Sequence, residues 1–189
     1  PGGGSVSAYM GSVGAALTAM VANLSSHKRG WDDRWEEFSA WAEKAKRIQE
    51  KLLGLVDADT RAFNAIMDAF GLPKKSPEEQ ENRKQAIEQA TIHAIEVPFE
   101  VMRTAFAGFE IAEAMTRTGN PNSVSDAGVG VLALQACIEG AWLNVLINAV
   151  ELKDHPRVQE IQKEGKELIE KSLEVKSRIL KQVKEIITS

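Results

Sequence analysis

The chain has 189 residues, of which 43% are hydrophobic and 26% are charged. This composition is typical of one globular domain whose own core stabilises it without metals or disulfides. The net charge of −4 argues against a nucleic-acid-binding surface, which would require a basic patch. The single cysteine, Cys137, excludes an internal disulfide and is typical of a reducing compartment, so we expect a cytoplasmic protein.

Residues 1–25 carry no charged side chain and are rich in Gly, Ala, Ser and Thr. The stretch is nearly long enough to cross a membrane, but it has few large aliphatic residues and no basic segment before it. We therefore expect neither a transmembrane helix nor a signal peptide. Small residues recur every four positions from Ser7 to Ala19, which favours close helix packing. The sequence predicts a first helix, capped by Ser5 and ending near Leu24, at the centre of the protein.

The next two helical segments are separated by a proline-containing loop. Residues 32–70 are predicted to form two helices or one bent helix with a weak point at Gly54. The pattern from Ser76 to Glu79 is a capping box with proline at the first helical position, so the next helix begins there. Pro98 is expected to divide or kink that helix.

The remainder of the chain is also predicted to be helical, over about residues 125–152 and again from Pro156 onward. We find no segment of alternating polarity longer than a few residues. The sequence therefore predicts an all-α, single-domain helical bundle over residues 1–189.

Asp59 occupies an unusual position in the second segment. At 100° per residue it lies in the middle of the apolar stripe formed by Leu52, Leu55, Phe63 and Ile66. Asp57, two residues earlier, falls on the polar side. Burial favours the protonated form of an unpaired carboxylate, and such groups serve as general acids or bases. The alternative is a structural role, in which Asp59 binds a helix terminus or a Lys or Arg of a neighbouring helix.

Two asparagines share one face of the apolar segment near residue 140. Asn144 and Asn148 are one turn apart, and Asp126, Gly130 and Cys137 lie on the same face. Buried amides need hydrogen-bond partners. Either they bond a neighbouring helix or they bind a heterocyclic ligand, and the pattern alone leaves both open.

Glycines 2–4 stand immediately before the first helix. Bare N–H groups and the positive end of a helix dipole suit a carboxylate or another anionic group, although a tight turn or a flexible tail is equally consistent. Lys74, Lys75 and Arg83 surround the start of the third helix. They form either a solvated charged face or a recognition site for an anionic tail.

The sequence predicts no metal site. His27, His93 and His155 have no helical spacing to one another or to Cys137. His27, near the end of the first helix, is a weak acid–base candidate.

Six blocks of the sequence together resemble the formimidoyltetrahydrofolate cyclodeaminase / methenyltetrahydrofolate cyclohydrolase family. In chain order they are “PGGGSVSAYMGSVGAALTAMVANLS”, “LVDADTRAF”, “LPKKSPEE…R”, “VPFEV”, “GNPNSVSDAGVG” and “GAWLNVLIN”. The resemblance covers nearly the whole chain and implies an all-α, homodimeric protein. The absence of charge in the first helix predicts that this helix lies near the dimer interface. Members of this family normally carry a short helical segment before the first block, whereas this sequence begins at Pro1.

The resemblance also implies an activity. The family's cyclodeaminases convert N5-formimidoyl-tetrahydrofolate to 5,10-methenyl-tetrahydrofolate and ammonia. The family's catalytic aspartate matches Asp59, the second acid of “VDAD”, which would take a proton from N10 and supply it to the leaving amine. The resemblance implies no metal, and no cofactor beyond the tetrahydrofolate substrate, which can be polyglutamylated.

Substrate-binding residues follow from the matching blocks. The resemblance implies a backbone wall or anion site made by Gly2, Gly3, Gly4 and Ser5. It implies contacts with the pterin edge from Asn120, Ser125, Asp126, Asn144 and Asn148. It implies contacts with the glutamate tail from Lys74 and Arg83.

Alternative functions remain open at this stage. A cyclohydrolase would add water to the methenyl bridge and give 10-formyl-tetrahydrofolate, through a similar tetrahedral carbon. A non-catalytic helical binding or scaffold protein would keep the fold without the chemistry. In animals the same domain forms the C-terminal half of formimidoyltransferase-cyclodeaminase, so a formimidoyltransferase is a candidate partner.

Overall fold

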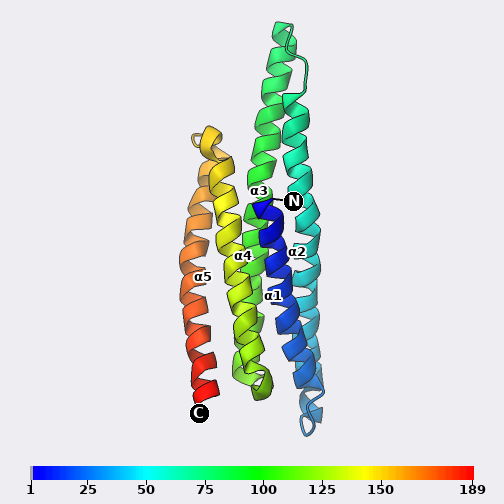
Figure 1. Ribbon diagram of the computed structural model, residues 1–189, viewed down its shortest axis with the longest axis vertical. Helices are drawn as coiled ribbons and strands as arrows, with labels where there is room; N and C mark the ends of the chain where they lie inside the picture. The colour runs from blue at the N-terminus through cyan, green and yellow to red at the C-terminus, as the bar shows by residue number, and fades with distance from the viewer. Residues whose placement is uncertain (1) are drawn as a thin grey trace.

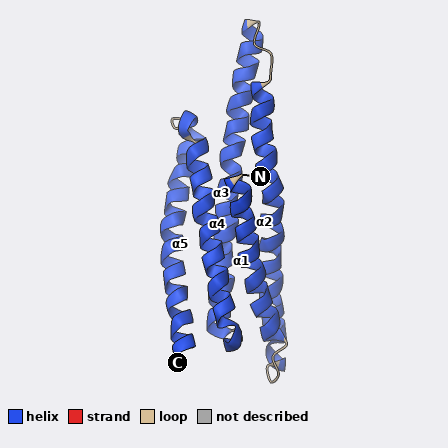
Figure 2. Cartoon of the chain, viewed as in Figure 1, coloured by secondary structure: helices blue, strands red, loops and turns tan. Residues whose placement is uncertain are grey.

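A computed structural model describes residues 2–189, and Pro1 lies outside the described residues. Five helices account for most of the chain: α1 (Gly3–Ser26), α2 (Trp35–Phe70), α3 (Pro77–Thr118), α4 (Val124–Asn148) and α5 (Pro156–Thr188). Short 3-10 turns precede α2, α4 and α5, namely η1 (Asp32–Arg34), η2 (Pro121–Ser123) and η3 (Val150–Leu152). Residues 2–189 contain no strand, which confirms the predicted all-α bundle (Figure 2).

The helices form an elongated bundle with one projecting end. Helix α1 packs against α2, α4 and α3, and α5 lies along the outer side of α3 and α4 (Figure 1). The α2–α3 hairpin extends well beyond the start of α1 and the end of α4. The first turn of α1 therefore lies against the middle of α2 rather than at an end of the molecule.

Helix α1 is a buried small-residue helix, as predicted. It runs antiparallel to α4, because Gly3 lies near Asn144 while Gly14 lies against Gly130. A Cβ added at Gly14 would be only 2.9 Å from the carbonyl oxygen of Gly130. The two backbones approach this closely because neither residue has a side chain.

The start of α1 differs from the prediction. The N-cap is Gly2, so Ser5 lies within the first turn and its hydroxyl is not a cap. Its hydroxyl bonds Asp59 of α2 instead. The sequence around Ser5 does not indicate this bond, because Asp59 lies 54 residues further along the chain.

Helices α2 and α3 are each continuous, which excludes two separate helices over residues 32–70 and a division of α3 at Pro98. Gly54 is exposed inside α2, where a glycine weakens the helix without ending it. Pro98 is buried inside α3 and neither ends nor divides it. By contrast, the predicted capping box at Ser76 and Glu79 is confirmed, with both of its hydrogen bonds formed.

Two helical segments are long and apolar enough to cross a membrane, judged by length and composition alone. They are Gly3–Ser26 and the segment Pro121–Asn148, with 61% and 44% of their most apolar windows buried inside the protein. Small residues and packing against α2 and α3 account for the buried part. The remaining apolar side chains of these two helices are half-buried or exposed.

Candidate functional site

A cavity of about 350 Å³ lies where four helices meet. The N-terminus of α1, the middle of α2, Ala94 of α3 and the end of α4 form its walls. Its volume lies within the range of small-molecule sites in proteins. Six predicted site residues line it: Gly2, Gly3, Gly4, Asp59, Asn144 and Asn148. The structure thus brings together residues from three of the sequence blocks.

Asp59 is half-buried in the wall of this cavity. The hydroxyl of Ser5 donates a hydrogen bond of 2.7 Å to its Oδ2, and the Thr60 hydroxyl lies 3.3 Å from the Ser5 hydroxyl. Within residues 2–189, every ion pair involves other carboxylates. Asp59 is therefore oriented by a hydroxyl rather than by a Lys or Arg.

The surroundings of Asp59 are more open than its apolar stripe predicts. Leu52 is fully buried, but Phe63 is 61% exposed and lines the cavity with Ile66. The apolar stripe is buried in the bundle at Leu52 but exposed at Phe63, because this part of α2 belongs to the projecting α2–α3 hairpin. Asp59 is thus accessible to a ligand, as a proton-transfer group must be.

Gly4 allows the carboxylate of Asp59 to approach α1. A Cβ added at Gly4 would collide with both oxygens of Asp59. The first hydrogen bond within α1 runs from the N–H of Val6 to the carbonyl of Gly2. Gly2 is the N-cap of α1, so the N–H groups of the first turn have no partner within the helix and are available to an acceptor at its positive end.

The two asparagines of α4 use their nitrogens within the protein. Asn148 Nδ2 donates to the carbonyl of Ala94 on α3, at 2.8 Å. Asn144 Nδ2 donates to the carbonyl of Gly140 on its own helix, also at 2.8 Å. Asn148 therefore makes the predicted bond to a neighbouring helix, whereas Asn144 bonds only its own helix. The side-chain oxygens of both residues remain as acceptors beside the cavity.

The structure does not bring Lys74 and Arg83 to the cavity. Both lie at the far tip of the α2–α3 hairpin, where Lys74 is exposed in the connecting loop. The guanidinium of Arg83 donates to the carbonyl of Phe70, at 3.2 and 3.3 Å, and lies over the Phe70 ring. In this chain Arg83 satisfies a free carbonyl at the end of α2.

Asn120, Ser125 and Asp126 lie at the opposite end of the bundle. The N–H of Asn120 donates to the hydroxyl of Ser25 at the end of α1, 2.8 Å away, and its side chain caps η2. Asp126 lies in the first turn of α4, about 27 Å along the helix axis from Asn144 at 1.5 Å per residue. Within one chain these residues lie outside the lining of the cavity at Asp59.

Sequence reasoning missed five lining residues: Thr60, Ala62, Phe63, Ile66 and Ala94, of which Phe63 and Ile66 were predicted only as part of the apolar stripe. Thr60 follows Asp59 directly in the motif “DADT” and its hydroxyl contacts that of Ser5. Its place next to Asp59 could have indicated that it belongs to the site. Ala94 carried no signal, because its carbonyl rather than its side chain matters to the site.

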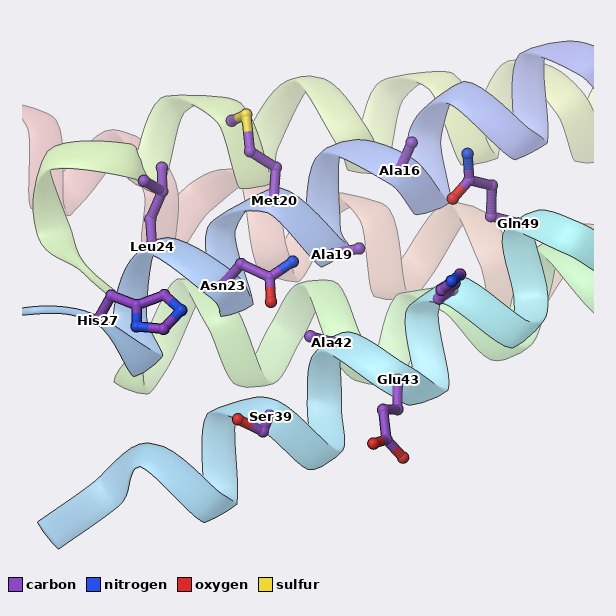
Figure 3. Close-up of a pocket in the computed structure, with 11 residues that line it drawn as sticks. Ala16, Ala19, Met20, Asn23, Leu24, His27, Ser39, Ala42, Glu43 and Gln49 are labelled. Carbon is purple, nitrogen blue, oxygen red and sulfur yellow. The ribbon is translucent and has the colours of Figure 1, made fainter. Parts of the chain in front are cut away.

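A larger, open groove of about 640 Å³ runs between the C-terminal half of α1 and the N-terminal half of α2 (Figure 3). Its walls combine Ala and other apolar side chains with a similar number of polar ones, with His27 at one end and Gln49 at the other. Glu43 and Lys46 at its rim form ion pairs along α2. The groove offers His27 no hydrogen-bonded carboxylate, so the cavity at Asp59 is the better candidate for chemistry.

Cys137 is unsuited to nucleophilic catalysis. It is buried between α1 and α4, and burial raises the pKa of its thiol to about 12. The thiolate is the reactive form, so this cysteine is chemically inert in the folded protein.

Comparisons with known proteins agree with this geometry. Residues 1–167 match the formiminotransferase-cyclodeaminase family. The chain is 36% identical over 184 residues to methenyltetrahydrofolate cyclohydrolase of Methylorubrum extorquens, covering 97% of this chain and 88% of that protein. It is 33% identical to formimidoyltransferase-cyclodeaminase of Mus musculus over 88% of this chain, but spans only 32% of that longer protein.

A solved structure has the same fold. The crystal structure of formiminotetrahydrofolate cyclodeaminase from Thermotoga maritima superposes with a TM-score of 0.76 and 28% sequence identity, covering 98% of this chain and 87% of that one. The family match extends over more than half of the chain and includes every residue that lines the cavity at Asp59. The chain belongs to the formiminotransferase-cyclodeaminase family.

Proposed function

We propose that this protein closes N5-formimidoyl-tetrahydrofolate to 5,10-methenyl-tetrahydrofolate and releases ammonia. The observation that carries the proposal is the position of Asp59, the one ionisable side chain among the described lining residues of the cavity. Ser5 orients it and Gly4 leaves room for it. A single carboxylate suits this chemistry, because the formimidoyl group is a cationic amidine and the methenyl product is also a cation.

The proton balance requires one group that both accepts and donates. N10 attacks the carbon of the protonated formimidoyl group, which gives a tetrahedral carbon between N5 and N10. Asp59 removes the proton from N10 and delivers it to the amino group on that carbon. The C–N bond then breaks, ammonia leaves, and the positive charge stays on the methenyl bridge.

The cavity also suits the pterin ring. The oxygens of Asn144 and Asn148 are acceptors for ring N–H groups, and the free N–H groups at the start of α1 are donors for a ring carbonyl. Phe63 and Ile66 provide apolar contact for the ring faces. Because the reaction moves protons and no electrons, we expect no cofactor beyond the tetrahydrofolate and no metal.

A second candidate activity is the cyclohydrolase reaction. The relative from Methylorubrum extorquens carries that name and is similar over nearly its full length. In this reaction Asp59 would remove a proton from the attacking water rather than from N10. The two reactions share a tetrahedral carbon between N5 and N10, so one site can serve either.

A homodimer would explain the exposed apolar side chains of α1 and α4. We define the apolar face as Val6, Val13, Met20 and Leu24 of α1 with Val129, Leu132, Leu143 and Ile147 of α4, each at least 38% exposed. The two stripes are adjacent because the helices pack antiparallel. Contiguous apolar surface of this kind marks protein interfaces.

The proposed dimer also gives a use to the residues at the far end of the bundle. A two-fold axis across the apolar face that reverses the helix direction carries the start of α4 of one copy toward the cavity of the other. Asn120, Ser125 and Asp126 would then contact the pterin from the second copy. Lys74 and Arg83 would remain candidates for a polyglutamate tail. A cytoplasmic location and a formimidoyltransferase partner complete the proposal.

The test is a paired assay of wild type and Asp59→Asn. We expect wild type to form methenyl-tetrahydrofolate and ammonia in equal amounts from N5-formimidoyl-tetrahydrofolate, followed by absorbance and an ammonia assay. Asp59→Asn should lower kcat by about 10²- to 10⁴-fold, the usual contribution of a general acid–base group. Hydrolysis of added methenyl-tetrahydrofolate without ammonia release would assign the cyclohydrolase reaction instead. Inactivity of wild type toward both would leave a binding protein.

A further inference from the structure

Pro98 interrupts the hydrogen bonding of α3 beside the cavity. Proline has no N–H, so the carbonyl of Ala94, four residues earlier, has no donor within the helix. Pro98 is buried, and Ala94 is only 5% exposed. A buried carbonyl without a donor costs free energy, so this position calls for a donor from outside α3.

Asn148 of α4 supplies that donor. Its Nδ2 lies 2.8 Å from the carbonyl oxygen of Ala94. Since a carbonyl oxygen can only accept, the bond determines which end of the amide faces α3. One of the two N–H groups of the amide is used, and within residues 2–189 no side-chain hydrogen bond engages the oxygen, which lies on a residue that lines the cavity.

We propose that Pro98 is a positioning residue that fixes Asn148 as a hydrogen-bond acceptor toward the substrate. It acts through the carbonyl of Ala94, which it deprives of a helical partner. The inference rests on the proposed function and deepens it, because it states that the protein accepts hydrogen bonds here and the ring donates them. The acceptor binds the N–H edge of the pyrimidine part of the tetrahydropterin, which carries the 2-amino group and N3–H.

Asn144 follows the same rule by a separate contact. One N–H of its Nδ2 donates to the carbonyl of Gly140, and among residues 2–189 no side-chain hydrogen bond engages its oxygen either. The two acceptors are one helical turn apart, about 6 Å along the axis of α4. Together with the carboxylate of Asp59 they make this wall rich in acceptors. A ligand with an edge of N–H donors therefore complements this wall.

Three variants test the role of Pro98: Pro98→Ala, Asn148→Ala and the double variant. Pro98→Ala restores the N–H that Ala94 lacks, so the Asn148 amide loses its fixed orientation. We expect KM for N5-formimidoyl-tetrahydrofolate to rise about fivefold in each single variant, the loss expected for one neutral hydrogen bond, with kcat within twofold. The double variant should show no further rise, because both changes remove the same interaction.

Val101→Ala is the matched control. Val101 is fully buried one turn further along α3, outside the cavity, so the change trims the same helix without altering its hydrogen bonds. We expect it to lower the melting temperature and leave KM unchanged. A substrate analogue without the 2-amino group should lose affinity for wild type but not for Asn148→Ala.

Two results would overturn the inference. One is an unchanged KM in Pro98→Ala alongside a raised KM in Asn148→Ala, and the other is additive effects in the double variant. A readout without turnover separates this inference from the proposed function. The side-chain amide of Asn148, observed by NMR, should show one slowly exchanging proton in wild type and lose it in Pro98→Ala. If wild type is inactive toward both folates, the proposed function fails, and this NMR comparison alone then decides the role of Pro98.

Discussion

At the scale of single residues, Asp59 depends on two neighbours at the start of α1. Ser5 is almost fully buried and donates to one carboxylate oxygen, and Gly4 leaves the space that the carboxylate occupies. A catalytic carboxylate must be held within a fraction of an ångström of its working position. We therefore expect the chemistry to be sensitive to changes in residues that do not touch the reacting atoms.

Ser5→Ala is the direct test of this dependence. It removes a hydrogen bond to Asp59 and should lower kcat roughly tenfold, because hydrogen bonds to charged groups are the stronger ones. Ser12→Ala is the matched control, since Ser12 is also buried in α1 but donates to the carbonyl of Tyr9 away from the cavity. Steady-state kinetics on both variants provides the measurement. Equal kcat values would show that Ser5 does not orient Asp59.

The sequence predicted Asp59 but not its environment. Helical periodicity was sufficient to separate Asp59 from Asp57, because the pattern is local. The bond from Ser5 joins positions 54 residues apart, so no local rule could find it, and Ser5 was wrongly predicted as a cap. The same reason explains the open alternatives for Asn148, whose partner Ala94 is also 54 residues away.

At the scale of helices, local signals predicted the ends well and the interiors poorly. The capping box at Ser76 places the start of α3 where the structure has it. The predicted division of α3 at Pro98 is absent, and the helix continues across the proline while the side chain of Asn148 from α4 satisfies the freed carbonyl of Ala94. Helix continuity at a proline therefore depends on the neighbouring helix, which the sequence of α3 alone does not contain.

The contact between α1 and α4 provides a stability prediction. Gly14→Ala would place a methyl group 2.9 Å from the carbonyl oxygen of Gly130, in a contact with no flexible side chain to yield. We expect a loss of about 1–3 kcal/mol in the free energy of unfolding, the usual cost of overpacking. Gly54→Ala is the control, because Gly54 is exposed in α2 with open space around it, and it should stabilise the helix slightly. Urea titrations of the two variants should therefore shift in opposite directions.

At the scale of the whole molecule, the proposed dimer predicts complementation between inactive chains. Asp59→Asn and Asp126→Ala would each inactivate both sites of a homodimer. A mixed dimer would hold one site with both native residues, so equal mixing should restore about a quarter of wild-type activity under random assortment. Assays before and after mixing by mild denaturation and refolding provide the measurement. Failure to regain activity, with mixed dimers verified by mass, would show that Asp126 does not serve the partner's site.

The buried thiol predicts how stability depends on pH. The folded pKa of Cys137 is about 12, above the ordinary value of 9.0, because burial disfavours the thiolate. Above pH 9 the unfolded chain loses this proton while the folded chain keeps it. The free energy of unfolding should therefore fall from pH 9 toward pH 12. Cys137→Ala should show a smaller decline over that range, and equal slopes would contradict the prediction.

The projecting α2–α3 hairpin has a consequence for motion. Beyond the start of α1 and the end of α4, only two helices pack against each other (Figure 1). Regions with few buried contacts open locally at a lower cost than the core, and their amide protons exchange sooner with solvent. Exchange should therefore begin at the loop around residue 74 and advance along both helices toward Asp59 and Ala94. A ligand bound in the cavity would contact α1 and α4 as well as the inner ends of the hairpin. Amide exchange near Asp59 and Ala94 should therefore be slower with ligand bound.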